Sequence, residues 1–244
     1  MQGGSARVLR STGYLRTGEI SSIIEYCDSA SRTGGDKCFQ VIANYMFIAI
    51  EGCFGVGKTT VARGLAVRRD SKLLLEDFES NPFLRSFYEN PIENAFETEF
   101  AFLLQHFHQL KAEIDIVEKS EVIADFHLGK DLLYADLNLG DLRAKQLFGG
   151  LYQLCMEKVP RPGLLIFLSA TTELLVERIR SRKRDFESQI DFKYCDAVNT
   201  AYEEFFRQHS SKKLRVDMDE WDFVKEESLY ERLVTLVDRE LETK

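Results

Sequence analysis

The sequence predicts an α/β domain of the P-loop NTPase type, with a five-stranded parallel sheet flanked by helices. Three observations support this fold class. Short apolar segments alternate with longer amphipathic ones, a glycine-rich phosphate-binding motif directly follows the first apolar segment, and no internal repeat interrupts the alternation. Because strands that alternate with helices form parallel sheets covered on both faces, we expect one domain of this architecture.

The five predicted strands are short apolar segments bounded by polar or turn-forming residues. They are Met46–Ile50, Lys72–Leu75, Glu121–Ala124, Leu164–Leu168 and Lys213–Val216. Each is followed by at least one segment whose apolar residues recur every three or four positions, which is typical of an amphipathic helix. These predicted helices are Thr59–Arg68, Ala95–Lys119, Leu139–Lys158, Thr172–Ser181, Tyr194–His209 and Leu229–Leu241.

Residues 1–45 differ from the rest of the chain, because they are rich in Ser, Gly and Thr and lack a sustained apolar period. We expect this segment to be a disordered extension and residues 46–244 to form the domain. Alternatively, Met46 is the true start of the protein, since it begins the first apolar segment.

Composition limits the classes of partner. The chain has 244 residues, of which 44% are hydrophobic, and a net charge of -8. A nucleic-acid polymer would be repelled on average and is not an expected partner. The five cysteines are scattered without C-x-x-C spacing, which fits a reducing cytosol. Neither a membrane span nor a secretion signal is recognisable, so we expect a cytoplasmic protein without a membrane partner.

The phosphate-binding motif has the form G-x-x-x-x-G-K-[ST] and lies between a predicted strand and a predicted helix. It reads Gly52-Cys53-Phe54-Gly55-Val56-Gly57-Lys58-Thr59, with Thr60 as the next residue of the helix. Glycines let backbone N–H groups converge on phosphate oxygens, and the helix N-terminus adds donors and a favourable dipole. Lys58 can reach the β- and γ-phosphates, and the Thr59 hydroxyl can ligate Mg²⁺. The motif predicts a nucleoside triphosphate site and leaves the phosphate acceptor open.

Four later segments resemble the deoxynucleoside kinase family. They are Leu75-Glu76-Asp77-Phe78-Glu79-Ser80-Asn81-Pro82-Phe83-Leu84, Phe87-Tyr88-Glu89-Asn90-Pro91, Asp125-Phe126-His127-Leu128-Gly129-Lys130-Asp131 and Arg182-Lys183-Arg184-Asp185-Phe186-Glu187. The third is similar to the bacterial deoxyadenosine and deoxyguanosine kinase branch. The resemblance runs from about Phe47 to Phe223. It implies that ATP phosphorylates the 5′-hydroxyl of a deoxynucleoside, and that the protein is a homodimer like many members.

Two acids follow predicted strands, at the sheet edge where such folds bind ligands. The resemblance implies that Glu76 accepts the proton of the sugar hydroxyl, a role that suits a carboxylate aligned with the γ-phosphorus. It also implies that Asp125 completes a Mg²⁺ site with Thr59, because this cation needs only one or two carboxylates besides phosphate and water. The alternatives are a solvated strand-end acid for Glu76 and a helix cap for Asp125.

A run of basic residues follows the helix after the fourth strand. It comprises Arg178, Arg180, Arg182, Lys183 and Arg184. The resemblance implies an arginine-rich lid over the phosphates, with Arg182 and Arg184 stabilising the transferring phosphoryl group. A merely solvated helix face is the alternative.

Weaker matches concern the sugar of the nucleoside and the adenine of ATP. The resemblance implies that Tyr88 and Glu187 hold the sugar 3′-hydroxyl, and that Asp222 and Phe223 belong to the loop around the adenine of ATP. Tyr88 could equally be a packed aromatic side chain, and a ring such as Phe223 is more often part of a core.

One departure from the family lies after the third strand. Many members have an acid followed by Arg and Ser, whereas this chain has Phe126 and His127 at those places. Lys130 or a lid arginine is the expected substitute for the missing arginine. His106, His108, His127 and His209 show no metal-ligand spacing, so we expect ordinary surface or core histidines.

A second departure concerns recognition of the base. Counting from Tyr88, the helix position that carries a base-reading Gln in well-known members is Glu99 here. An ionised Glu offers acceptors only, which suits the N1–H and N2–H₂ donors of guanine. We therefore expect a purine substrate, with deoxyguanosine or a ring with a similar edge preferred. Gln105 is the fallback if the alignment has slipped, and a solvent-facing Glu99 is the alternative.

Two other function classes remain open at this point. A nucleoside monophosphate kinase of the thymidylate-kinase type would need cations near Glu76 and Tyr88 to hold the acceptor's phosphate, and that segment contains only Arg85. A nucleotide-binding regulatory protein without kinase activity is favoured only by Phe126 in place of arginine.

Overall fold

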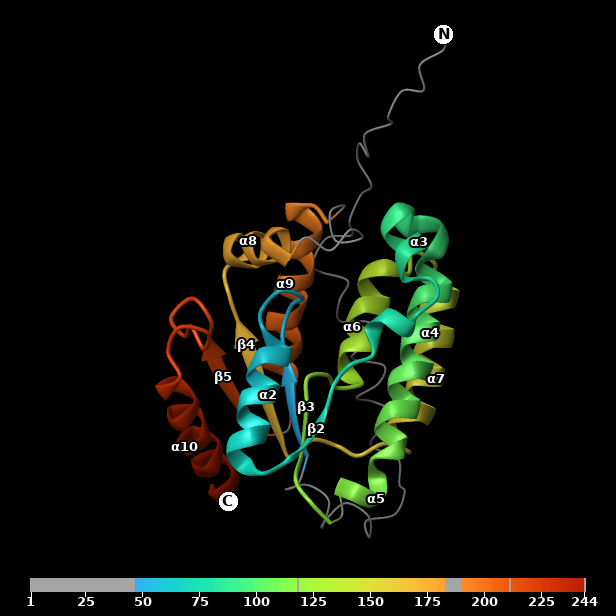
Figure 1. Cartoon of the computed structure of the whole chain (residues 1–244). Coiled ribbons are helices and arrows are strands. Elements are labelled where there is room, and N and C mark those ends of the chain that lie inside the picture. The colour runs from blue at the N-terminus through green and yellow to red at the C-terminus, as the bar shows by residue number, and fades with distance from the viewer. Residues whose placement is uncertain (1–46, 118, 183–189, 211, 244) are drawn as a thin grey trace.

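The computed structural model describes residues 47–117, 119–182, 190–210 and 212–243 (Figure 1). The expected N-terminal extension lies outside these ranges, as do Lys183, Arg184 and Glu187. The strands are β1 (Phe47–Glu51), β2 (Lys72–Leu74), β3 (Val122–Ala124), β4 (Leu164–Ser169) and β5 (Lys213–Asp217). They form one sheet in the order β2-β3-β1-β4-β5, and all neighbours pair in parallel. The predicted five-stranded parallel sheet is confirmed.

Helices connect the strands. They are α2 (Lys58–Arg69), α3 (Leu84–Glu89), α4 (Pro91–Ala112), α5 (Ile114–Val117), α6 (Gly129–Asn138), α7 (Leu142–Met156), α8 (Thr172–Arg182), α9 (Phe192–Gln208) and α10 (Ser228–Glu242). Local signals explain several of their starts. Pro91 occupies the first turn of α4, where its missing N–H costs nothing. Asp141 and Asp191 cap α7 and α9 by accepting hydrogen bonds from the backbone N–H groups of Arg143 and Tyr194.

Two predicted helices differ from the structure by three residues or more at one or both ends, and the other four by at most two residues at either end. The helix expected at 95–119 begins at Pro91 and ends at Ala112, with the short α5 after it. The helix expected at 139–158 is α7 alone and begins at Leu142. The sequence analysis missed α6, because buried polar residues such as Lys130 and Asp131 interrupt its apolar period.

The sheet separates two apolar cores. Ile48 and Ile50 of β1 belong to the core that includes buried residues of α2, α8, α9 and α10. Phe47 and Ala49 belong to the core formed with α4, α6 and α7. Side chains alternate along a strand, so the fully buried β1 serves both faces. Figure 1 shows α10 and α2 on one side of the molecule and α4, α6 and α7 on the other.

Strand order places the ligand-binding edge. β2 and β3 lie on one side of β1, and β4 and β5 lie on the other. Chain connections therefore leave this edge in opposite directions, which is where open α/β sheets bind ligands. Within the described ranges, the structure has no helix with the length and apolarity needed to span a membrane.

Candidate active site

The loop after β1 has the backbone shape of a phosphate cradle. Gly52, Gly55 and Gly57 all have positive φ angles, of 147°, 88° and 109°. A Cβ added at Gly52 would lie 2.4 Å from the backbone oxygen of Leu168, so only glycine fits there. Gly57 immediately precedes α2, whose free N–H groups therefore face the loop. The side chains of Cys53 and Val56 are buried, so these two residues can offer only their backbone to a ligand.

The functional side chains of this motif lie at the start of α2. Lys58 Nζ donates hydrogen bonds to the carbonyl oxygens of Gly52 (2.7 Å) and Cys53 (3.3 Å). Burial and the charge of Lys130 both lower the pKa of Lys58. Thr59 Oγ1 donates to Asp125 Oδ2 at 2.5 Å. Asp125 follows β3, so the structure joins the two residues predicted to share a Mg²⁺ ion.

A cavity of about 710 Å³ opens beside the loop. Its walls include Phe54, Lys58, Thr59, Glu76, Tyr88, Glu99, Asp125, Lys130, Asp131, Asn138 and Arg182. The phosphate-binding residues and the predicted substrate-binding residues thus border one space. The volume suits a small molecule.

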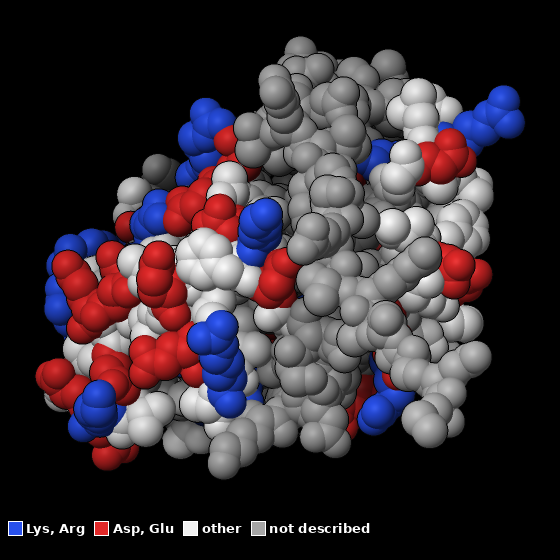
Figure 2. Space-filling model, turned by 90° about the horizontal axis from the view of Figure 1, so that it is seen from above, with Lys and Arg blue, Asp and Glu red and all other residues white. Residues whose placement is uncertain are grey.

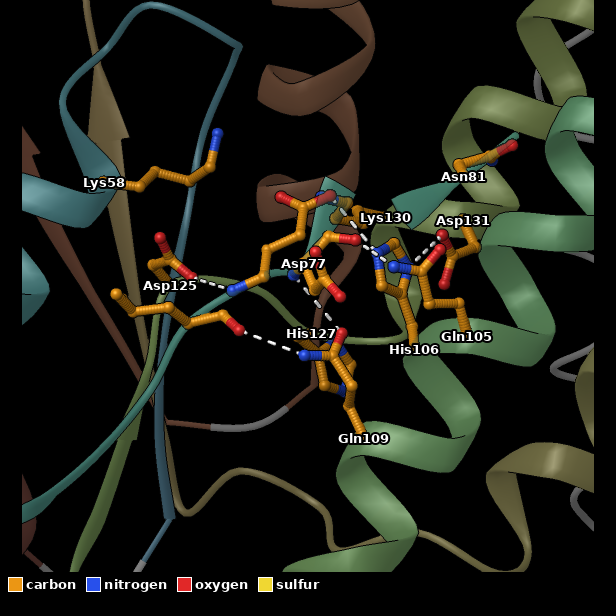
Figure 3. A network of polar contacts seen from close by, with 12 residues as sticks. Lys58, Asp77, Asn81, Gln105, His106, Gln109, Asp125, His127, Lys130 and Asp131 are labelled. Carbon is orange, nitrogen blue, oxygen red and sulfur yellow. Dashed lines mark hydrogen bonds and ion pairs between the residues drawn. The ribbon is translucent and has the colours of Figure 1, made fainter. Parts of the chain in front are cut away.

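Glu76 lies two residues beyond the end of β2 and is held at both its backbone and its carboxylate. Its backbone N–H donates to Asp125 Oδ1 at 2.7 Å. Its Oε1 lies 2.5 Å from Lys130 Nζ and 3.2 Å from His106 Nε2. On the far side of the imidazole, His106 Nδ1 lies 2.7 Å from Asp131 Oδ1 (Figure 3). We call Glu76, His106, Lys130 and Asp131 the Glu76 network.

Opposing charges set the protonation states in this network. Burial raises the pKa of Glu76, but the charges of Lys130 and His106 outweigh burial, and the pKa is lowered well below its usual range. Burial lowers the pKa of His106, but Asp131 and Glu76 outweigh burial and raise it to about 9. Glu76 is therefore a carboxylate at neutral pH, and His106 is an imidazolium.

The sequence analysis missed the role of His106. It predicted an ordinary surface or core histidine, whereas the fully buried ring lies between two carboxylates at the cavity. Glu76, His106 and Asp131 are far apart in the sequence, and no spacing rule connects them. Phe126, at the family's arginine position, is fully buried in the core beside α4 and α7.

Glu99 lines the cavity from α4 and is only 3% exposed, so the solvent-facing alternative is wrong. Its Oε1 accepts a hydrogen bond of 2.8 Å from Asn138 Nδ2, and Asn138 Oδ1 accepts one from the Tyr194 hydroxyl at 3.3 Å. Burial raises the pKa of Glu99 to about 8, against the lowering effect of the Asn138 hydrogen bond. Gln105 instead donates to the backbone oxygen of Asp77 and is not among the residues that line the cavity.

The three described arginines of the basic run lie in three different environments. Arg178 donates to the carbonyl oxygens of Val56 (2.9 Å) and Met218 (3.4 Å), so it braces the phosphate loop. Arg180 is exposed, and Arg182 lines the cavity at the end of α8. Figure 2 views the molecule from above, and acidic and basic side chains are mixed over the described part of this face.

The segment predicted to surround adenine is not part of the cavity wall. Phe223 is 5% exposed and packs against Trp221 and Tyr230, with ring centroids 5.6 and 4.7 Å apart. Asp222 forms an exposed ion pair with Lys225 at 2.9 Å. The core alternative for Phe223 therefore describes its placement, and its contact with adenine stays a prediction.

Thr59 and Asp125 have the chemistry that a magnesium ion requires. A hydroxyl and a carboxylate are hard oxygen donors, and this cation commonly binds through one or two such groups plus substrate phosphates and water. The described residues contain no group of three or more His, Cys, Asp or Glu placed to hold a metal. A partial protein shell of this kind fits a cation that arrives with a triphosphate.

Comparisons with known proteins agree with this geometry. The family model "Deoxynucleoside kinase" matches residues 48–242. A deoxyguanosine kinase from Bacillus subtilis is 34% identical over 198 residues, covering 78% of this chain and 95% of the relative. A deoxyadenosine/deoxycytidine kinase from the same organism is 26% identical over 199 residues, covering 77% and 89%. The solved structure of M. mycoides deoxyadenosine kinase with bound dCTP has a TM-score of 0.68 and 26% identity, covering 80% of this chain and all of that one.

The family model spans most of the chain, including four whole strands of the sheet and all of β1 except Phe47. These matches favour a kinase over a regulatory protein that binds nucleotide without phosphoryl transfer. The chain belongs to the deoxynucleoside kinase family, whose members are nucleotide-binding phosphotransferases.

Proposed function

We propose that this protein transfers the γ-phosphate of ATP to the 5′-hydroxyl of a purine deoxynucleoside, with deoxyguanosine preferred. The observation that carries the reaction is the shared cavity, which is bordered by Lys58 of the phosphate loop and by the Glu76 carboxylate. A deoxynucleoside bound in this cavity would have its 5′-hydroxyl between Lys58 and the Glu76 carboxylate. Family membership supports this placement.

In the proposed reaction, Glu76 accepts a hydrogen bond from the 5′-hydroxyl and takes up its proton as the oxygen attacks the γ-phosphorus. Lys58 exchanges its bonds to Gly52 and Cys53 for phosphate oxygens and neutralises part of their charge. Arg182, on the cavity wall, and Arg184, outside the described residues, are proposed to stabilise the transferring group. Most of the rate enhancement would come from positioning and electrostatics.

Thr59 and Asp125 are proposed to hold Mg²⁺, which would neutralise phosphate charge when bound. In the structure these two side chains are hydrogen-bonded to each other. Asp125 also accepts the N–H of Glu76, so the same carboxylate links the metal ligands to the proposed base. If Mg²⁺ replaced the hydrogen bond between Thr59 and Asp125, the hydrogen bond from the Glu76 N–H to Asp125 would remain.

The deoxyguanosine preference rests on Glu99. Ionised, its carboxylate offers two acceptors that suit the N1–H and N2–H₂ donors of guanine, whereas adenine presents an acceptor that it would repel. Asn138 holds Oε1 of Glu99 at 2.8 Å and thereby fixes the carboxylate at the cavity wall. The relative with 34% identity is named a deoxyguanosine kinase, which supports the same choice.

Further contacts are proposed from the same resemblance. Tyr88 lines the cavity and would hold the sugar 3′-hydroxyl together with Glu187. A homodimer would cover exposed apolar side chains of α7, namely Leu142 (63% exposed), Leu147 (58%) and Leu154 (59%).

The test is a panel of labelled ATP with each deoxynucleoside and each deoxynucleoside monophosphate. We expect phosphate transfer to the deoxynucleosides, fastest for deoxyguanosine. Transfer to monophosphates alone would support the thymidylate-kinase alternative instead. Tight ATP binding without transfer to any acceptor would contradict the proposed reaction.

A further inference from the structure

We propose that Tyr194, in the first turn of α9, is a positioning residue for base selection, and that it acts through Asn138 to favour the ionised form of Glu99. This inference rests on the proposed function, because that function assigns Glu99 as the residue that reads the nucleobase. It adds a residue from a third helix to the pair formed by Glu99 and Asn138.

The three side chains form a hydrogen-bonded chain along one wall of the cavity. The Tyr194 hydroxyl donates to Asn138 Oδ1 at 3.3 Å, and Asn138 Nδ2 donates to Glu99 Oε1 at 2.8 Å. All three residues line the cavity. Asn138 is the last residue of α6, which packs against both α4 and α9, and Figure 1 shows α6 between these two helices. The chain therefore joins three helices at the cavity.

The direction of this hydrogen-bonded chain bears on the protonation of Glu99. An amide side chain has an acceptor oxygen and a donor NH₂ group. Because the oxygen of Asn138 accepts from Tyr194, its NH₂ group is the end that faces Glu99. A donor in this place stabilises the carboxylate and not the protonated acid. Among the described residues, Asn138 alone donates a hydrogen bond to Glu99, so the orientation of this amide matters.

Contacts other than the hydroxyl hold Tyr194 in place. The ring of Phe54, in the phosphate loop, stacks on it with centroids 6.0 Å apart and an interplanar angle of 19°. The backbone N–H of Tyr194 donates to the side chain of Asp191, the N-cap of α9, at 2.7 Å. The ring also packs against both apolar cores. Tyr194→Phe keeps the ring and the backbone, so it removes the bond to Asn138 with little other change.

Other groups act on Glu99 from the elements around it. Burial has the largest effect and raises its pKa, and the Asn138 hydrogen bond lowers it. The charge of Asp131 raises the pKa further, whereas His106 and Lys130 lower it. The other titratable side chains on the cavity wall are Lys58 and Arg63 of α2, Glu76 after β2, Tyr88 of α3, Asp125 after β3, Tyr134 of α6, Arg182 of α8 and Tyr194 itself. None of the described residues that line the cavity belongs to α7. Apart from Tyr194, all of these groups stay the same in Tyr194→Phe.

The first measurement is the titration of Glu99 in the absence of substrate. Carbon-13 NMR of glutamate-labelled full-length protein gives it, with the Glu99 signal assigned by its loss in Glu99→Gln. Without the hydroxyl, the Asn138 amide is free to turn its oxygen toward a protonated Glu99. We therefore expect the midpoint to lie about half a pH unit higher in Tyr194→Phe than in the wild type. Asn138→Leu removes the donor itself and should give a larger upward shift.

The second measurement is base selection at about pH 8, where Glu99 is half ionised. A midpoint half a unit higher lowers the ratio of ionised to protonated Glu99 about threefold. We expect kcat/KM for deoxyguanosine relative to deoxyadenosine to fall by the same factor in Tyr194→Phe. Tyr230→Phe is the matched control, because the Tyr230 hydroxyl also donates to one acceptor, the backbone oxygen of Thr60 (3.1 Å), and Tyr230 does not line the cavity. It should change neither the Glu99 titration nor the ratio.

A double variant separates the role through Glu99 from direct contact of Tyr194 with the base. In Glu99→Gln the titrating group is absent, so adding Tyr194→Phe should leave the ratio unchanged. If the second substitution lowers the ratio about threefold in this background as well, Tyr194 acts without Glu99 and the proposal is wrong.

The remaining outcomes distinguish this proposal from the proposed function. If Glu99 titrates alike in the wild type and Tyr194→Phe, Tyr194 does not favour its ionised form, even when deoxyguanosine is the best substrate. If the midpoint rises as expected and the ratio stays the same, the role of Tyr194 in base selection is wrong. If the midpoint rises and the wild type phosphorylates no deoxynucleoside, the effect of Tyr194 on Glu99 is as described and the proposed function is wrong.

Discussion

The phosphate-binding loop takes its groups from one short segment, whereas the Glu76 network gathers its side chains from three elements far apart in the sequence. In the loop, the glycine backbone and the N-terminus of α2 form most of the phosphate cradle, and Lys58 donates a hydrogen bond to a backbone carbonyl oxygen. In the network, buried charges contact one another directly. We therefore expect the loop to tolerate changes in its buried side chains better than the network tolerates the loss of any one charge.

The comparison also separates generic from specific chemistry. A triphosphate is bound by groups that many proteins share. In the proposed function, Glu76 and Glu99 select the sugar hydroxyl and the nucleobase, and burial and neighbouring groups set the protonation states of both side chains. Substitutions in the cavity should thus change rate and selectivity, and the predictions below are ordered by the size of that change.

The largest effect is expected for Glu76→Gln. The amide cannot take up the hydroxyl proton, and it leaves Lys130 and His106 without their shared carboxylate. We expect kcat for deoxyguanosine to fall about 1,000-fold, measured by steady-state kinetics. Glu113→Gln is the control, since Glu113 pairs with Lys72 away from the cavity wall, and it should remain active. Equal activity of both variants would show that Glu76 is not the base.

The next effect concerns magnesium. Asp125→Asn removes the only carboxylate that contacts Thr59, within the part of the chain that the structure describes. We expect kcat at a fixed Mg²⁺ concentration to fall about 100-fold, and the Mg²⁺ concentration needed for half-maximal rate to rise. An unchanged magnesium titration would remove Asp125 from the metal site.

A smaller effect is expected from pH. The pKa of Glu99 is raised to about 8, so the acid is mainly protonated below that pH and ionised above it. Protonated, it offers a donor and an acceptor as Gln does; ionised, it offers acceptors only. The ratio of kcat/KM for deoxyguanosine to that for deoxyadenosine should therefore rise with pH, by about tenfold across two units centred on 8. If this ratio does not change with pH in the wild type, Glu99 does not select the nucleobase.

The smallest effect is expected for Asn138→Leu, which removes the hydrogen bond that holds Glu99. We expect kcat/KM for deoxyguanosine to fall about fivefold, with a smaller fall for deoxyadenosine. Asn94→Leu is the control, because Asn94 bonds only the backbone oxygens of Ser86 and Asn90 among the described contacts. The same loss in both variants would point to general destabilisation, detectable as a lowered Tm.

The two regions also differ in how far the sequence predicts them. The loop and β1 are continuous in the chain, so a motif and an apolar segment were enough to locate Lys58 and Thr59. The resemblance to the family implied the pairing of Thr59 with Asp125, and both residues were expected at one sheet edge. The sequence analysis named Glu76 and Lys130 of the Glu76 network. It could not predict the contacts of His106 with Glu76 and Asp131, because α4 and α6 meet through packing that no local pattern specifies.

Two features that the sequence analysis did not determine, the helix α6 and the choice between Glu99 and Gln105, also depend on tertiary packing. The helix α6 begins at Gly129 and buries Lys130 and Asp131, so its polar residues looked like a loop. The positions of Glu99 and Gln105 could be distinguished only by the rotation of α4, which puts Glu99 in the cavity wall and Gln105 against the backbone of Asp77. The burial of α6 and the rotation of α4 are both set by contacts between elements that are distant in the sequence.

Base selection by Glu99 is tested most directly by comparing deoxyguanosine and deoxyadenosine in the wild type and Glu99→Gln. The glutamine keeps the size and can still accept from Asn138, but it loses the second acceptor. At about pH 9, where Glu99 with its pKa of about 8 is mainly ionised, we predict that kcat/KM for deoxyguanosine relative to deoxyadenosine falls by about 10- to 100-fold in the variant. A ratio that is the same in both proteins would contradict it.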